Sequence, residues 1–225
     1  MEKPTLRLEQ QEPAAEFEFS GKRFKIFKDV YNPAEDSFML AKYSASRASG
    51  RILDVGTGSG IQAIFANASV AVDINEKAVE NARYNCALNN CKCEVIHSDL
   101  FSKVSGEFDT IIFNPPYLPT SPDEVTKGPI DLAWNGGSDG RAVIDKFLAL
   151  FSPFLAPGGK LLMLHSSLAD TEKTVLALRH LGFKVEILEE KNIGEESLCV
   201  LEATKPKISA KGKGSAQLLS ASTQI

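Results

Sequence analysis

Residues 114–117, Asn-Pro-Pro-Tyr, follow directly on an apolar run that suits a buried strand. One interpretation is purely structural, because Asn-Pro commonly begins a turn and proline ends a strand. The other interpretation is catalytic. The side chain of Asn114 offers a carbonyl acceptor, and Pro115 and Pro116 lack the N–H groups that would pair backbone carbonyls locally. Two acceptors holding the N–H bonds of a planar NH2 group would orient its lone pair towards an electrophile, with the Tyr117 ring stacked on the group.

A glycine-rich segment at 53–60, LDVGTGSG, is the first candidate for holding that electrophile. Gly56, Gly58 and Gly60 let the backbone approach a ligand that side chains would keep away. A dinucleotide fingerprint would have glycine at the sixth position, where this chain has Ile61. The sequence also contains no G-x-x-x-x-G-K-[ST] loop, so a dinucleotide and a nucleoside triphosphate are both disfavoured.

Acidic residues mark the ends of three successive predicted strands: Asp54, Asp73 and Asp99. In sheets whose parallel strands alternate with helices along the chain, ligands bind beyond the carboxyl ends of the strands. Asp73 could accept both hydroxyls of a ribose, and Asp99 could accept from an adenine amino group while Leu100 flanks the ring. Singly, Asp73 also fits a helix cap and Asp99 a loop. Together with the glycine loop they indicate an adenosine site, and S-adenosylmethionine is the ligand that fits best.

The elements that must position these residues alternate between strands and helices from residue 51 onward, after an N-terminal β-hairpin centred on Ser20-Gly21. This alternation is typical of a mostly parallel sheet with helices on both faces, and two consecutive strands at the end suggest an antiparallel closing pair. We predict strands at 51–55, 69–73, 93–97, 108–113, 160–165, 183–190 and 197–204, and helices at 32–48, 61–66, 75–89, 143–151 and 170–181. Pro33 suits the first turn of the first helix, and Asn75 suits the cap of the third. Pro157-Gly158-Gly159 should end the helix at 143–151, and residues 114–137 should form a loop.

Composition and charge limit the class of protein. The 225 residues are 43% hydrophobic and 24% charged, with no membrane-length apolar run and no signal peptide, so no association with a membrane is expected. The four cysteines form neither a disulfide framework nor a spaced zinc set, so we expect a reduced, cytoplasmic location and no metal. The net charge is −4, and segment 205–225 contributes four lysines and no acid. Residues 1–204 therefore carry −8, which argues against nucleic-acid binding.

The motifs LDVGTGSG, VDIN, SDLF and NPPY, in this order, resemble those of the class I S-adenosylmethionine-dependent methyltransferases. VYNPAEDSF at 30–38, WNGGSDGRAVIDKF at 134–147 and IGEESLCVLEATK at 193–205 are similar to the HemK-type protein-glutamine methyltransferases, in their short archaeal and eukaryotic branch. The resemblance implies a Rossmann-like, seven-stranded sheet with strand 93–97 at one edge and an antiparallel last strand.

The resemblance also implies roles for particular residues and a methyltransferase domain 16–204 (hairpin and lid 16–48, catalytic core 49–204). Because residues 1–15 have no periodicity and residues 205–225 are rich in Lys, Gly, Ser and Ala, we expect a flexible segment 1–15 and a disordered basic tail 205–225. The expected catalytic residues are Asn114, Pro115, Pro116 and Tyr117. The expected cofactor-binding residues are Ser37, Asp54, Gly56, Gly58, Asp73, Asp99, Leu100 and Asn114.

The implied reaction is N5-methylation of the glutamine in the Gly-Gly-Gln motif of a class I translation release factor. Alternatives are an N6-adenine DNA methyltransferase or a protein-lysine methyltransferase using the same pocket, and, from another class, a non-catalytic cofactor-binding subunit. The family also suggests a small zinc-binding activator protein that pairs with edge strand 93–97. Because the nitrogen loses its proton readily once alkylated, His97 and His165 are expected to be structural.

Overall fold

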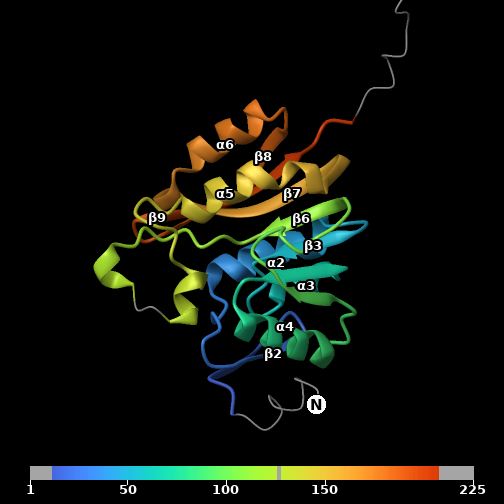
Figure 1. Cartoon of the computed structure of the whole chain (residues 1–225), viewed down its shortest axis with the longest axis vertical. Helices are drawn as coiled ribbons and strands as arrows, with labels where there is room; N and C mark the ends of the chain where they lie inside the picture. The colour runs from blue at the N-terminus through green and yellow to red at the C-terminus, as the bar shows by residue number, and fades with distance from the viewer. Residues whose placement is uncertain (1–11, 126–127, 208–225) are drawn as a thin grey trace, which may run out of the picture.

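The computed structural model describes residues 12–125 and 128–207 (Figure 1). The expectations for a flexible N-terminus and a disordered tail therefore fall mostly on residues 1–11 and 208–225, outside the described part. The strands are β1 (Ala15–Phe19), β2 (Lys22–Ile26), β3 (Ile52–Val55), β4 (Val70–Asp73), β5 (Glu94–His97), β6 (Phe108–Phe113), β7 (Leu155–Ser166), β8 (Lys184–Ile193) and β9 (Glu196–Thr204). The α-helices are α2 (Glu35–Arg47), α3 (Ile61–Ala66), α4 (Glu76–Leu88), α5 (Ala142–Leu150) and α6 (Thr171–His180).

The central sheet has seven strands in the order β5-β4-β3-β6-β7-β9-β8. β3, β4, β5, β6 and β7 pair in parallel, whereas β9 is antiparallel to both β7 and β8. This confirms the predicted mostly parallel sheet with an antiparallel last strand, and it places β5 at one edge. The strand order reverses between β3 and β6, so the carboxyl ends of these two strands flank the crevice where such folds bind ligands.

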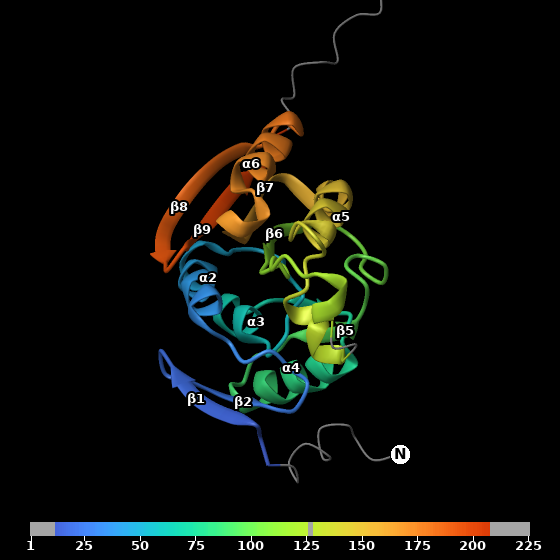
Figure 2. The ribbon, with the colours of Figure 1, turned by 90° about the vertical axis from the view of Figure 1, so that its left-hand side faces the viewer.

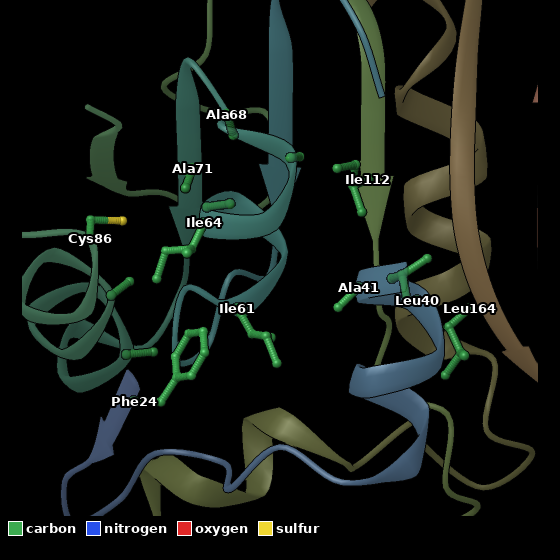
Figure 3. Packing of buried hydrophobic residues seen from close by; sticks show 14 of the residues in the cluster. Phe24, Leu40, Ala41, Ile61, Ile64, Ala68, Ala71, Cys86, Ile112 and Leu164 are labelled. Atoms are coloured by element: carbon green, nitrogen blue, oxygen red, sulfur yellow. The ribbon is translucent and has the colours of Figure 1, made fainter. Parts of the chain in front are cut away.

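Helices cover both faces of the sheet because its strands are apolar on both sides. In β6, Ile112 packs in one core with Leu40 of α2, whereas Ile111 and Phe113 pack in the other core. Phe113 stacks on Phe147 of α5 with 4.2 Å between ring centroids. Successive strand residues point to opposite faces, so one uninterrupted apolar run supplies both layers. Figure 3 shows the first core, where Phe24, Leu40, Ile61 and Ile112 converge from the hairpin, two helices and the sheet.

The N-terminal hairpin is attached to α4 by three asparagines spaced one helical turn apart, Asn81, Asn85 and Asn89. Their side-chain oxygens accept from the backbone N–H groups of Phe27 (2.8 Å), Lys25 (3.0 Å) and Arg23 (3.1 Å). The side chains thus pair with the free edge of β2, and Figure 2 shows the hairpin lying beside α4. This attachment matters for the site, because the chain runs directly from β2 into the segment that carries Tyr31 and Asp36.

Three local predictions were wrong in detail. Pro33 was expected in the first turn of α2, but the helix begins at Glu35 with Ala34 as N-cap, so Pro33 precedes it. Pro157-Gly158-Gly159 was expected to end α5, but α5 ends at Leu150 and these residues lie inside β7, where the pairing with β6 shifts register. The segment after Asn114, expected to be loop, contains the 3-10 helices η1 (Pro122–Glu124) and η2 (Pro129–Ala133).

In the described part of the chain, no helix combines the length and apolarity needed to cross a bilayer.

Candidate active site

A cavity of about 840 Å³ lies at the carboxyl ends of β3, β4, β5 and β6, and the segment between β6 and α5, at the left of Figure 1, forms part of its wall. Most residues predicted to bind cofactor or substrate line it, although they come from five separate parts of the chain. These residues are Ser37, Gly56, Gly58, Asp73, Asp99, Leu100, Asn114, Pro115, Pro116 and Tyr117.

Asp54 is the predicted cofactor residue that does not line the cavity. Its side chain is fully buried behind the glycine loop, where one carboxylate oxygen accepts from Thr57 Oγ1 (2.6 Å) and from the backbone N–H of Ala63 (3.0 Å). These bonds tie the loop to the first turn of α3. Burial raises the pKa of Asp54 to about 7, although both bonds oppose the shift. The geometry supports a role for Asp54 in holding the loop.

The raised pKa of Asp54 predicts a pH-dependent penalty to stability. Below pH 4 the carboxyl is neutral in both folded and unfolded chains; as pH rises towards 7 only the unfolded chain ionises it. The contribution of Asp54 should therefore decrease over this window, by at most about 1.4 kcal/mol per pH unit, and stay constant above it. Urea unfolding of wild type and Asp54→Asn between pH 4 and 8 measures this as a changing difference in the free energy of unfolding. Parallel pH curves would contradict it.

Asp73 links β4 to the glycine loop and to the next helix. Its carboxylate accepts from the backbone N–H of Gly58 (2.8 Å) and from that of Asn75 (2.8 Å). Asn75 in turn caps α4 by accepting from Lys77 N (2.9 Å), as predicted. Burial raises the pKa of Asp73, and the backbone donors oppose the shift. A carboxylate offers about four acceptor sites, so Asp73 can still accept from hydroxyl groups of a ligand.

Asp99 occupies a more exposed part of the cavity wall. Its carboxylate forms an ion pair with Lys146 Nζ of α5 at 2.6 Å, and both side chains are about half exposed. Leu100 beside it is buried and adopts a left-handed backbone conformation with φ of 45°, which turns the chain sharply after β5. The structure thus brings Asp99 and Leu100 together at the cavity as predicted, and adds a cation that the sequence analysis did not identify.

The amide of Asn114 is held in one orientation. Its Nδ2 donates to Asp36 Oδ2 (3.0 Å) and to Ser37 Oγ (3.5 Å), both in the first turn of α2. Its Oδ1 is buried, and among the described residues it has no hydrogen-bond partner. A buried acceptor without a donor costs about 1–3 kcal/mol, so the site retains an unsatisfied oxygen where the substrate nitrogen is expected.

Tyr117 contributes an aromatic surface. Burial, followed by the charges of Asp36 and Glu196, raises its pKa above the usual value for tyrosine, so the phenol stays protonated at neutral pH. The backbone beyond Tyr117 pairs with residues 134–137: Leu118 N donates to Trp134 O (3.0 Å), and Gly136 N donates to Leu118 O (2.9 Å). This pairing explains why an Asn-Gly-Gly segment accompanies the Asn-Pro-Pro-Tyr corner.

Gly140 is required where these two segments meet. Its φ is +73°, and a Cβ atom built there would collide with the carbonyl oxygen of Tyr117. Gly182 has a similar φ of +84° but nothing within 4 Å of the corresponding position. Gly182→Ala should therefore show only the backbone cost, about 1–2 kcal/mol, whereas Gly140→Ala adds the collision. We expect the lower melting temperature and the larger loss of activity for Gly140→Ala. Equal effects would show that the contact with Tyr117 is unimportant.

The cavity is acidic. Among the described lining residues the carboxylates are Asp36, Asp73, Asp99 and Asp131, and the only basic side chain is Lys146. Such a site favours a cationic ligand and disfavours a phosphate backbone. No group of three or more His, Cys, Asp or Glu side chains in the described residues could hold a metal ion.

The structure places His165 outside the cavity and adds two residues to the cavity wall. His165 is buried away from the cavity, with Nε2 2.8 Å from Thr174 Oγ1, and burial lowers its pKa to about 4. Asp36 and Tyr31 are cavity residues that the sequence analysis did not identify. The only signal was the position of Asp36 beside Ser37, since its contact with Asn114 spans 78 residues of sequence.

Comparison with known proteins agrees with this geometry. The family described as methyltransferase small domain matches residues 35–127. A protein of Methanocaldococcus jannaschii, named as a protein N5-glutamine methyltransferase, is 41% identical over 191 residues, covering 83% of this chain and 97% of the relative. This chain belongs to the HemK-type class I methyltransferases. The human methyltransferase HEMK2 is a more distant relative, 30% identical over 200 residues, with 80% of this chain and 91% of the relative covered.

A solved structure extends the relationship of this HemK-type methyltransferase. The Mtq2–Trm112 complex of E. cuniculi, described as responsible for methylation of the eRF1 translation termination factor, aligns with a TM-score of 0.62 and 26% identity. The alignment covers 79% of this chain and 99% of the matched chain. A release factor glutamine methyltransferase of Deinococcus radiodurans is 36% identical over 150 residues, covering 61% of this chain and 52% of the relative. The names of the archaeal and bacterial relatives specify protein glutamine or a release factor as substrate, so they do not favour the DNA-adenine and protein-lysine alternatives.

Proposed function

We propose that this enzyme transfers a methyl group from S-adenosylmethionine to N5 of the glutamine in the Gly-Gly-Gln motif of a class I translation release factor. The observation that carries the proposal is the Asn114 amide, whose nitrogen is fully engaged while its buried oxygen remains an open acceptor beside an acidic cavity. The names of the archaeal and bacterial relatives and of the Mtq2–Trm112 complex support the choice of a release-factor glutamine.

The residues of the cavity fit S-adenosylmethionine. Gly56 and Gly58 have positive φ angles of 64° and 54° and present backbone close to the ligand. Asp73 would accept from ribose hydroxyls, Asp99 and Leu100 would border the adenine, and Ser37 would close over the methionine end. Four carboxylates against one ammonium group suit a ligand that carries a sulfonium. The cofactor supplies an activated methyl group, so the protein's task is chiefly to orient the nucleophile.

An amide nitrogen is a weak nucleophile because its lone pair is delocalised into the carbonyl. Asn114 Oδ1 and a backbone carbonyl of Asn114-Pro115-Pro116 would accept the two N–H bonds of the glutamine amide and fix the direction of its lone pair. The same acceptors stabilise the positive charge that develops on nitrogen, and Tyr117 packs against the flat amide. Such orientation can supply about 7–11 kcal/mol of the barrier reduction.

The direct test is mass spectrometry of a class I release factor after incubation with the enzyme and S-adenosylmethionine. We expect one added methyl group on the glutamine of the Gly-Gly-Gln motif, and none when that glutamine is replaced by asparagine. An unmodified release factor, under conditions in which the enzyme binds the methyl donor, would reject the proposed substrate.

A small zinc-binding activator is part of the same proposal. β5 is an edge strand, and among the described strands nothing pairs with its outer side, which could accept a strand from another protein. Hydrogen exchange at residues 93–97 should slow when the activator is co-expressed and bound, and unchanged exchange would argue against this docking site.

We also propose a cytoplasmic location. The named relatives act on release factors, and release factors work in translation.

A further inference from the structure

The donors and acceptors of the Asn114 amide can be accounted for completely. An amide has two N–H donors and one carbonyl acceptor. Both donors are directed at α2, to Asp36 Oδ2 at 3.0 Å and to Ser37 Oγ at 3.5 Å. The acceptor has no partner among the described residues, and it is buried. The amide is therefore fixed in orientation, with its nitrogen towards α2 and its oxygen without a protein donor among the described residues.

Asp36 determines this orientation, because an ionised carboxylate only accepts hydrogen bonds. If the Asn114 amide turned over, its oxygen would face the Asp36 carboxylate and two acceptors would repel each other. Ser37 imposes no such choice, since a hydroxyl both donates and accepts.

Asp36 is itself fixed in place. It is only 5% exposed, and its second oxygen accepts from the hydroxyl of Tyr31 at 3.1 Å. It also lies in the first turn of the 13-residue helix α2, where the helix dipole favours a negative charge. The pair with Asn114 is thus a charge-assisted hydrogen bond between two restrained side chains, which is a stronger type of contact than a neutral one.

We propose that Asp36 is a positioning residue for methyl transfer: it holds the Asn114 amide so that Oδ1 is available to accept from the substrate nitrogen. This inference rests on the proposed function for its substrate, but it assigns a new role to the first turn of α2. Since almost no solvent reaches Oδ1 in this structure, the atoms that cover it must shift when the substrate N–H group arrives.

Exchanging the two side chains tests the proposal. Asn114→Asp should lower kcat by about hundredfold or more, because two carboxylates then face each other at the position of the 3.0 Å contact. Asp36→Asn alone should lower kcat by about tenfold to hundredfold, because the amide loses its fixed orientation. In the double variant Asp36→Asn/Asn114→Asp the donor and acceptor are exchanged and an oxygen at position 114 remains free. We expect it to be at least about tenfold more active than Asn114→Asp.

The readouts separate positioning from folding and from the substrate assignment. KM for S-adenosylmethionine should change less than kcat in Asp36→Asn, and the side-chain amide resonances of Asn114 should exchange slowly with solvent in the wild type and faster in this variant. The proposal is overturned if Asp36→Asn keeps the wild-type kcat or amide protection, or if the double variant is no more active than Asn114→Asp. Should the wild type leave a release factor unmodified, the substrate assignment fails, and the amide exchange still decides the role of Asp36.

Discussion

Asn114→Ala should lower the rate of methyl transfer by about 10²–10³-fold while leaving the affinity for S-adenosylmethionine within about threefold. The substitution removes a buried acceptor that has no hydrogen-bond partner among the described residues, so the substrate nitrogen loses the group that orients it and stabilises its developing charge. Single-turnover methyl transfer to a release factor, together with calorimetric titration of the methyl donor, would separate the two effects.

The matched control for Asn114 is Asn192→Ala, which removes the same side chain from an exposed position on β8. It should leave both quantities unchanged. If Asn114→Ala retained the wild-type rate, the Asn-Pro-Pro-Tyr corner would be only the strand-ending turn that its sequence also permits.

Asp73→Ala should weaken binding of S-adenosylmethionine by about hundredfold, the second large effect. The variant loses the predicted acceptor for the ribose and leaves the N–H groups of Gly58 and Asn75 without their carboxylate. Since Gly58 belongs to the glycine loop, the change affects ligand contact and loop geometry together. Calorimetric titration measures the loss, and circular dichroism should show that the fold persists.

Asp99→Ala is the matched control for Asp73→Ala, because both residues are acids at the ends of neighbouring strands. Asp99 is about half exposed and pairs with Lys146, and exposed ion pairs contribute only about 0–1 kcal/mol. We expect a loss of affinity of less than about tenfold for Asp99→Ala. A larger effect at Asp99 than at Asp73 would contradict the assignment of Asp73 as the main anchor of the ribose.

Local sequence patterns predicted most of the fold because each element carries its own signal. Helix α3 and strand β6 have the predicted bounds, and Asn75 caps α4 as its position suggested. Prediction failed at Pro157-Gly158-Gly159. Proline and glycine usually interrupt elements, but here the register of β7 against β6 shifts and accommodates them. Only the neighbouring strand decides whether such residues end an element or lie within one.

The sequence by itself determined the order of strands and helices, the glycine loop, the acids at the strand ends and the Asn-Pro-Pro-Tyr corner, because these depend on periodicity and on residue types at short spacing. The tertiary structure alone decided what each side chain faces. It placed Asp54 behind the glycine loop, paired Asp99 with Lys146 and brought Asp36 to the amide of Asn114. Contacts between residues tens of positions apart arise when the sheet and its helices pack together, and no local pattern encodes which way an amide must turn.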